Sequence, residues 1–323
     1  MRRAFTLIEL IITMVILGIV AYVATDLIAK TYISYNRVNT LHKANLKVEL
    51  ALNNIANRLS YALSNTIVKR KSAKETNLAP IQRAPQDYQV LEWVGYDVDS
   101  FEANDYKGIN PILSGWSGFC NIKSSTKTNI VTPGSDLSLA SEIVYRLSNA
   151  KVNNLAGSAI FFPENYNYNN IGYSTTTGGV KGIEIVKNIS TTISPNEFLL
   201  NDSPNPKRVT EHYKLAWSAY AVVPTKPPAN KKDNPCKEVH NTVATDCTDE
   251  KPCNLCLKYN FRPWKGKDYD DTKVSASLLT TNVTVFKTFA VENRVHIKLC
   301  VKEQVAAGVN NSTSICKEKV VFK

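Results

Sequence analysis

Four cysteines lie close together in the last third of the chain and could either bind zinc or form disulfides. They are Cys236, Cys247, Cys253 and Cys256, with His240 between the first two. Structural zinc sites use thiolates and imidazoles, commonly in C-x2-C pairs, and only Cys253 and Cys256 have that spacing. In an oxidising compartment such a group instead forms two disulfides that staple a loop. The choice therefore depends on where this segment resides.

Three further cysteines lie outside this group. Cys300 and Cys316 flank a polar segment between two expected strands, which predicts a disulfide across a hairpin. A bridge closing about 15 residues is worth about 3 kcal/mol in the chain-entropy description. Cys120 makes the total odd, so at least one thiol is free or pairs with another chain.

Two acidic clusters could offer oxygen ligands to calcium. Their members are Asp97, Asp99, Glu102 and Asp105 in the first and Asp268, Asp270 and Asp271 in the second. Neither cluster has the ligand spacing of an EF-hand loop, and acidic turns are commonly only solvated. We therefore expect no metal and no cofactor.

Residues for catalysis are sparse. Four histidines, His42, His212, His240 and His296, are scattered along the chain. It contains no G-x-S-x-G, no phosphate-cradling glycine loop and no H-E-x-x-H. We expect no enzyme and no small-molecule substrate. A membrane-anchored periplasmic enzyme, with a site assembled in space, is the remote alternative.

An apolar N-terminal stretch is the element that organises the chain. A basic leader, residues 1–4, is followed by residues 5–25, in which Glu9 is the single charge. A helix of this length spans the roughly 30 Å core of a bilayer. The apolar run is longer than that of a secretory signal peptide, and no small-x-small site follows it. An unpaired charge in lipid costs at least ~2.5 kcal/mol, so Glu9 needs a partner unless it snorkels to the interface.

The segment Ala4, Phe5 and T-L-I-E-L of residues 6–10 resembles the N-terminal signature of the type IV pilin superfamily. The resemblance implies that a prepilin peptidase cuts between Ala4 and Phe5 and methylates the new amino group. The family usually has glycine where this chain has Ala4. The resemblance also implies that Glu9 faces the N-terminal ammonium of a neighbouring subunit and fixes the axial register of packed helices. Its implied fold is α+β, with a long N-terminal helix packed on an antiparallel β-sheet head.

The sequence supports continuation of this helix beyond the membrane. Apolar residues recur at helical spacing with a polar back, at Val38, Leu41, Val48, Leu52, Ile55, Leu59 and Leu63. We predict a membrane half over residues 5–29, an amphipathic half over 30–72 that ends in the basic run 69–74, and a β-rich head over 73–323.

Within the head, short alternating segments predict an antiparallel sheet rather than βαβ units. The predicted strands are residues 142–147, 182–186, 212–223, 257–264, 283–291, 295–301 and 318–322. Two long loops are expected, at 166–179 and, with the four grouped cysteines, at 224–256. The segments 278–289 and 295–299 resemble the closing strand pair of larger minor pilins and pseudopilins. With the length of the chain, this favours a minor subunit at a filament tip that helps to initiate assembly, among other pilins or pseudopilins.

Orientation follows from the leader, because Arg2 and Arg3 stay on the cytoplasmic side of the inner membrane. The head then lies in the periplasm, an oxidising compartment, which favours disulfides over zinc. Loss of the leader lowers the net charge from +11 to +9. A basic tip module that contacts DNA or a secreted protein is the alternative function. Whether the filament serves type II secretion, a type IV pilus or DNA uptake in natural transformation stays open.

Overall fold

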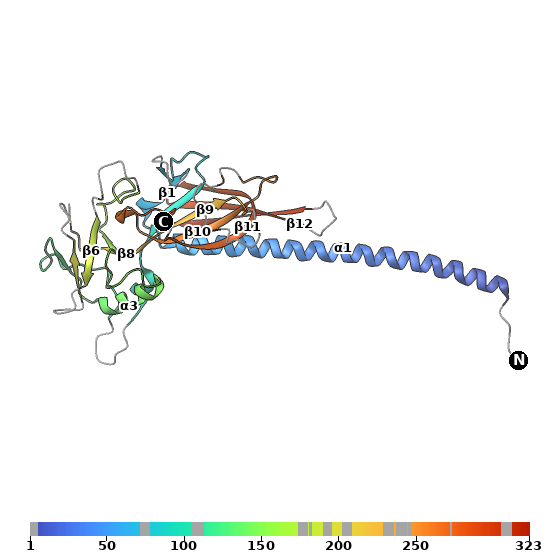
Figure 1. Ribbon diagram of the computed structural model, residues 1–323, viewed down its shortest axis with the longest axis horizontal. Helices are drawn as coiled ribbons and strands as arrows, with labels where there is room; N and C mark the ends of the chain where they lie inside the picture. Colours follow the sequence, from blue (N-terminus) through green and yellow to red (C-terminus); the bar gives the residue numbers. More distant parts are fainter. Residues whose placement is uncertain are drawn as a thin grey trace.

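The computed structural model describes residues 6–71, 78–104, 113–173, 180, 183–189, 196–201, 209–228, 236, 244, 247–271, 273–304 and 312–323. One long helix, α1 (Leu7–Ser60), projects from a β-rich head, so that the N-terminus lies far from the sheets (Figure 1). Residues 6–35 are exposed throughout. This part of α1 is long and apolar enough to cross a membrane, with a mean hydropathy of 2.6 in its most apolar window.

The second half of α1 is packed into the head, as its amphipathic pattern predicted. Its buried side chains are Ala44, Val48, Ala51, Leu52, Ile55, Ala56 and Leu59. Their spacing of three or four residues places them on one face of the helix. Two members of the predicted stripe differ, because Val38 is 62% exposed and Leu41 is only half-buried. The head therefore covers the helix only from about Ala44 onward.

The predicted end of the helix at residue 72 is wrong, since α1 ends at Ser60. Beyond it the backbone bonds to a strand of the head: the Leu63 N–H donates to the Val94 carbonyl at 2.9 Å. Residues 66–68 are all β-branched and prefer strand geometry. The chain accordingly forms a short 3-10 turn, η1 (Ser64–Thr66), and then strand β1 (Val68–Arg70).

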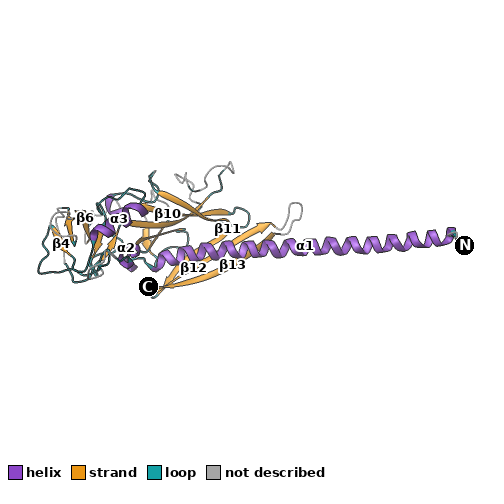
Figure 2. Cartoon of the chain, turned by 90° about the horizontal axis from the view of Figure 1, so that it is seen from below, coloured by secondary structure: helices purple, strands orange, loops and turns teal. Residues whose placement is uncertain are grey.

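The head contains an eight-stranded antiparallel sheet, here called the main sheet. Its order is β13-β12-β11-β10-β9-β3-β1-β2. Besides β1, its strands are β2 (Leu78–Pro80), β3 (Val90–Gly95), β9 (Ser218–Thr225), β10 (Cys253–Phe261), β11 (Ser275–Val291), β12 (Arg294–Gln304) and β13 (Ser312–Phe322). The stem, defined as the part of α1 from Ala44 to Ser60, packs on β11, β12 and β13 (Figure 2). The largest apolar core joins the stem to this sheet.

A second, five-stranded sheet belongs to a segment inserted between two neighbouring strands of the main sheet. Its order is β4-β7-β6-β5-β8. The strands are β4 (Asn129–Val131), β5 (Ala159–Phe161), β6 (Ile183–Ile189), β7 (Glu197–Leu200) and β8 (Lys214–Ala216), and helices α2 (Val98–Glu102) and α3 (Leu137–Leu147) accompany them. We call residues 96–217 the inserted unit. It lies at the end of the molecule opposite the N-terminus (Figure 1).

Two strand predictions fail in the inserted unit. Residues 142–147, expected as a strand, are the C-terminal part of α3, because Asp136 caps that helix and Leu137, Ala140 and Val144 form its buried face. Residues 212–223, expected as one strand, divide at Trp217 into β8 and β9, which belong to different sheets. The other five predicted segments all coincide in part with strands of the structure.

Candidate functional site

The amino end of α1 is the candidate processing and assembly site, and its described part begins at Thr6. Thr6 caps the helix and, with Glu9, forms a reciprocal capping box. The backbone N–H and the hydroxyl of Thr6 donate to Oε2 of Glu9 at 3.2 and 3.0 Å. The Glu9 N–H donates in return to the Thr6 hydroxyl oxygen at 3.4 Å. Glu9 thus has a partner within its own chain, a role that our sequence interpretation did not assign to it.

Ala4 and Phe5 lie outside the described residues, so cleavage and methylation there stay predictions. The register role of Glu9 involves a second chain and also stays a prediction. The structure does show which surface this end of α1 exposes. None of the most apolar window of α1 is buried within the structure. An exposed apolar surface of this size needs lipid or other helices around it.

The comparisons with known proteins bear on this same segment. Residues 1–24 match the family model of the prokaryotic N-terminal methylation motif. The chain has the N-terminal motif and the architecture of a type IV pilin-like protein. In such pilin-like proteins the motif implies processing by a prepilin peptidase and assembly with other pilins. No curated protein and no solved structure matches the chain significantly.

The cysteines of this pilin-like chain form three disulfides in the structure. Cys236 pairs with Cys256 and Cys247 with Cys253, so the loop cysteines pair among themselves. Both bridges connect the loop to β10. Because all four grouped cysteines are disulfide-bonded, none of them has a free thiolate that could bind zinc. His240 lies outside the described residues.

The third bridge closes the last hairpin. Cys300 and Cys316 are bonded to each other and are register partners across β12 and β13. This is the hairpin disulfide that their spacing predicted. The seventh cysteine, Cys120, is a buried free thiol, and burial raises its pKa.

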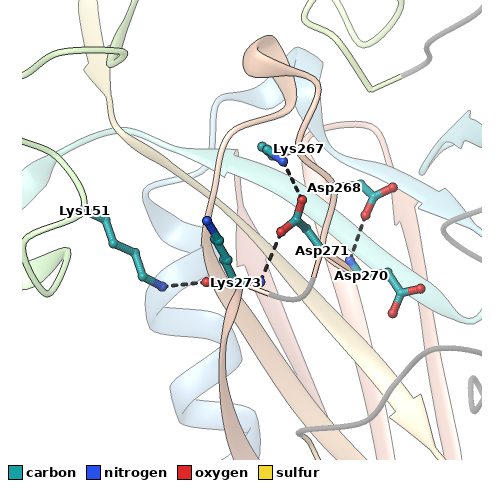
Figure 3. A network of polar contacts seen from close by, with 6 residues as sticks. All are labelled: Lys151, Lys267, Asp268, Asp270, Asp271 and Lys273. Carbon is teal, nitrogen blue, oxygen red and sulfur yellow. Dashed lines mark hydrogen bonds and ion pairs between the residues drawn. The ribbon is translucent and has the colours of Figure 1, made fainter.

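Members of both acidic clusters make local hydrogen bonds. Oδ1 of Asp97 accepts the Ser100 N–H as the cap of α2. In the second cluster, Asp271 accepts hydrogen bonds from the Lys267 ammonium at 2.8 Å and from the Lys273 N–H at 3.1 Å (Figure 3). Asp105 lies outside the described residues. Among the described residues, no group of three His, Cys, Asp or Glu side chains is arranged to hold a metal ion.

Of the three described histidines, His212 and His296 make local contacts. Nδ1 of His296 lies 2.7 Å from Glu318, and its ring stacks on Phe289. His212 is exposed and meets the ring of Phe119 edge-on. His42 is an exposed residue of α1.

The basic run 69–74, expected at the end of the helix, begins instead in strand β1, and its first two cations are buried. Lys69 and Arg70 are 6% and 2% exposed, and Lys69 donates to the Thr288 carbonyl. Nε of Arg70 lies 2.8 Å from Oε2 of Glu92 in a fully buried ion pair. Burial raises the pKa of Glu92 to about 7, although Arg70 opposes the shift.

Sequence reasoning missed the burial of three carboxyl groups. Besides Glu92, they are Asp97 and Glu184, whose pKa values burial raises to about 6 and about 7. A signal for two of them was present, since Glu92 interrupts the apolar run of β3 and Glu184 that of β6. Acidic residues within short apolar runs are costly unless paired or neutral, which marks them as sites of unusual electrostatics.

Proposed function

We propose that the chain is a minor pilin or pseudopilin, placed at or near the distal end of a membrane-anchored filament. The carrying observation is the methylation motif on a helix whose first half is fully exposed. That half is anchored in the inner membrane before assembly and packs against the helices of other subunits afterwards. The N-terminus is cytoplasmic and the head periplasmic, an orientation supported by Arg2 and Arg3 and by the three disulfides.

The inserted unit supports a distal position. It extends the head at the end opposite the N-terminus (Figure 1). When helices pack side by side with an axial stagger, each head must sit above the head of its neighbour nearer the membrane. Extra volume at the distal end would obstruct a head stacked above it and is best accommodated where no subunit lies farther from the membrane. A subunit of this kind is suited to start assembly rather than to extend the filament, and we assign it no catalysis.

Mass spectrometry of the membrane-extracted protein tests the processing step. The mature chain should begin at methylated Phe5. A chain that begins at Met1, or one cut after the apolar run, would contradict the pilin assignment. Immunogold labelling of sheared filaments tests the position, with label expected at one end only. Label along the whole length would overturn the distal placement and leave the pilin assignment intact.

A second candidate is a tip module that contacts DNA or a secreted protein. It is supported by the +9 charge of the processed chain, but burial of Lys69 and Arg70 removes two cations of the basic run 69–74 from the surface. Phosphate contacts make DNA affinity fall steeply with salt. Salt-dependent retention of the full chain on double-stranded DNA would favour DNA uptake. Retention of secreted proteins from the same cells would favour secretion.

A further inference from the structure

Strand β13 ends the main sheet, and its outer edge is open. The strand is 11 residues long and pairs with β12 in one continuous register, without a bulge or a proline. Among the described strands only β12 pairs with it. It lies beside α1 at the margin of the head (Figure 2). Proteins commonly shorten, bend or cover edge strands, because their free backbone groups can pair with another chain.

Two observations show which backbone groups of β13 face the open edge. The Lys323 N–H donates to the Asn293 carbonyl at 2.7 Å, so these two residues form a hydrogen-bonded pair. Cys300 and Cys316 have Cα atoms only 4.0 Å apart, as in a pair without hydrogen bonds. The two kinds of pair alternate along a ladder. The even-numbered residues of β13 therefore direct their N–H and C=O groups toward the open edge.

The face of this edge that points away from α1 is apolar and uncovered. Val320 and Phe322 are exposed there, Phe322 by 72%. Phe289 and Val291 are exposed on β11 in the same two cross-strand rows. The inserted unit covers this face of the main sheet at β1, β3 and β9, farther along the strand order. An exposed apolar patch beside an open edge marks an interaction surface.

The charges of the edge restrict which strand can pair with it. Strands β12 and β13 carry five Lys or Arg side chains and two Glu. Lys317 and Lys319 point toward α1, where their ammonium groups contact Glu49 and Asn53. A second copy of β13, paired antiparallel about Lys317, Glu318 or Lys319, would place like charges opposite one another, which is destabilising. The edge thus disfavours self-pairing and favours an acidic partner.

We propose that β13 accepts a strand from a different polypeptide at its open edge. Alternate residues of the added strand are acidic beside Lys317 and Lys319, and the intervening residues are apolar beside Val320 and Phe322. Main-chain hydrogen bonds supply affinity in such strand addition, and the alternating side chains supply specificity. The contact goes beyond the assembly role of α1, because the head makes it.

Fluorescence polarisation with the full, unassembled chain in a non-ionic detergent tests the proposal. The probe is a labelled nine-residue peptide of alternating valine and glutamate, and its counterpart has lysine in place of glutamate. The acidic peptide should bind saturably, about tenfold more tightly than the basic one, because the basic peptide sets like charges beside Lys317 and Lys319. No binding of the acidic peptide, or equal binding of both peptides, would overturn the proposal.

Two backbone-methylated forms of the acidic peptide test whether it adds as a strand. One form carries N-methyl groups on three valines, and the other carries them on three glutamates. Successive N–H groups of a strand point to opposite edges, so only one form keeps the N–H groups that face β13. Binding should weaken in the other form alone, about fivefold for each lost hydrogen bond. Equal affinities of the two forms would rule out strand addition.

Substitutions on β13 locate the site. Glu318→Pro removes an outward N–H and leaves the ladder with β12 intact, whereas Glu318→Ala keeps that N–H. The proline variant should bind the acidic peptide about fivefold more weakly than the alanine variant. The double variant Lys317→Gln/Lys319→Gln should also lose about fivefold relative to wild type. Lys287→Gln, exposed on β11 and two strands from the edge, is the matched control and should bind as wild type does.

Circular dichroism establishes that each variant is folded, and the lysine double variant carries the test if the proline variant is not. Equal affinity of the double variant and wild type would contradict the proposed site. Self-association of the wild-type chain that Glu318→Pro abolishes would assign the edge to a second copy and overturn the proposal. Because unassembled subunits are used, failure here leaves the filament assignment untouched.

Discussion

Gly95 and Ser218 are register partners at the ends of β3 and β9, yet the whole inserted unit separates them in sequence. The chain therefore leaves the main sheet and re-enters it at one point. The two sheets nevertheless share a core, in which Phe161 and Tyr173 of the inserted unit pack with Val68 and Val223 of the main sheet. The hydroxyl of Tyr173 also donates to the Thr66 carbonyl at 3.0 Å. This shared core makes the inserted unit a rigid extension of the head rather than a tethered module.

The buried pair of Arg70 and Glu92 lies beside this shared core, and Arg70→Met should be strongly destabilising. The substitution leaves Glu92 buried without its cation, which costs about 3–5 kcal/mol. The double variant Arg70→Met/Glu92→Leu should recover most of that loss, because it removes both desolvated groups. Urea denaturation measures both effects.

The matched control for this pair is Arg146→Met. Arg146 and Glu142 form an exposed pair on α3, for which about 0.3–0.5 kcal/mol is expected. If Arg70→Met cost no more than this control, the buried pair would not contribute to stability as argued.

Glu184→Gln should change how stability depends on pH. The folded-state pKa of Glu184 is about 7, above its ordinary 4.5, because the side chain is buried. Between these values the folded state holds a proton that the unfolded state has released, so stability falls as pH rises. Glutamine has no such proton. The variant should gain up to about 3 kcal/mol relative to wild type between pH 4.5 and pH 8.

Thermal or urea denaturation across that pH window measures the gain. Glu142→Gln serves as the exposed control and should show little change with pH. A constant difference between Glu184→Gln and wild type at all pH values would mean that Glu184 is ionised throughout and has a partner.

The sequence predicted those parts of the fold whose signal is periodic and local. The buried face at Val48, Leu52, Ile55 and Leu59 and the bridge from Cys300 to Cys316 followed from spacing alone. The prediction over residues 212–223 failed because alternation continues through Trp217, while the chain there passes from one sheet to another.

Other features depend on contacts distant in sequence. The apolar residues of 142–147 alternate as a strand would, and only the cap at Asp136 with the upstream Leu137 and Ala140 identifies a helix. The cavity beside Arg58, Asp97 and Tyr220 is lined by segments from residue 54 to residue 259, so no local pattern could indicate it. The capping box of Thr6 and Glu9 has the sequence signature T-x-x-E. It was overlooked because the charge of Glu9 was interpreted only as a partner for the ammonium group of a neighbouring subunit.

Truncation should separate the two halves of α1. A chain beginning at Lys30 keeps every buried residue of the stem and should be soluble and folded. A chain beginning at Tyr61 loses that buried face, a contribution on the order of 10 kcal/mol before entropy is counted. It exposes the apolar face of the main sheet and should aggregate. Size-exclusion chromatography distinguishes the soluble chain from the aggregated one. Equal stability of both chains would mean that the stem only connects the head to the membrane segment and does not stabilise the head.

Substitutions at Glu9 should distinguish its two roles. Glu9→Val removes both the charge and the capping box, whereas Glu9→Gln keeps the box, because glutamine is also found at that position of the motif. Both substitutions make the helix less charged, so membrane insertion should be retained in both. If the carboxylate faces the ammonium of a neighbouring subunit, both variants should fail to co-assemble, since burial of that ammonium is then uncompensated.

Cross-linking to neighbouring subunits in intact cells measures co-assembly, and membrane fractionation controls for insertion. Thr6→Val provides the converse test, because it removes the side-chain cap and leaves the charge of Glu9 in place. Co-assembly by Thr6→Val together with failure of Glu9→Gln would assign the essential role to the charge. Normal co-assembly by Glu9→Gln would instead restrict Glu9 to the capping box within its own helix, and the register of the filament would then have to be set by the apolar side chains of α1.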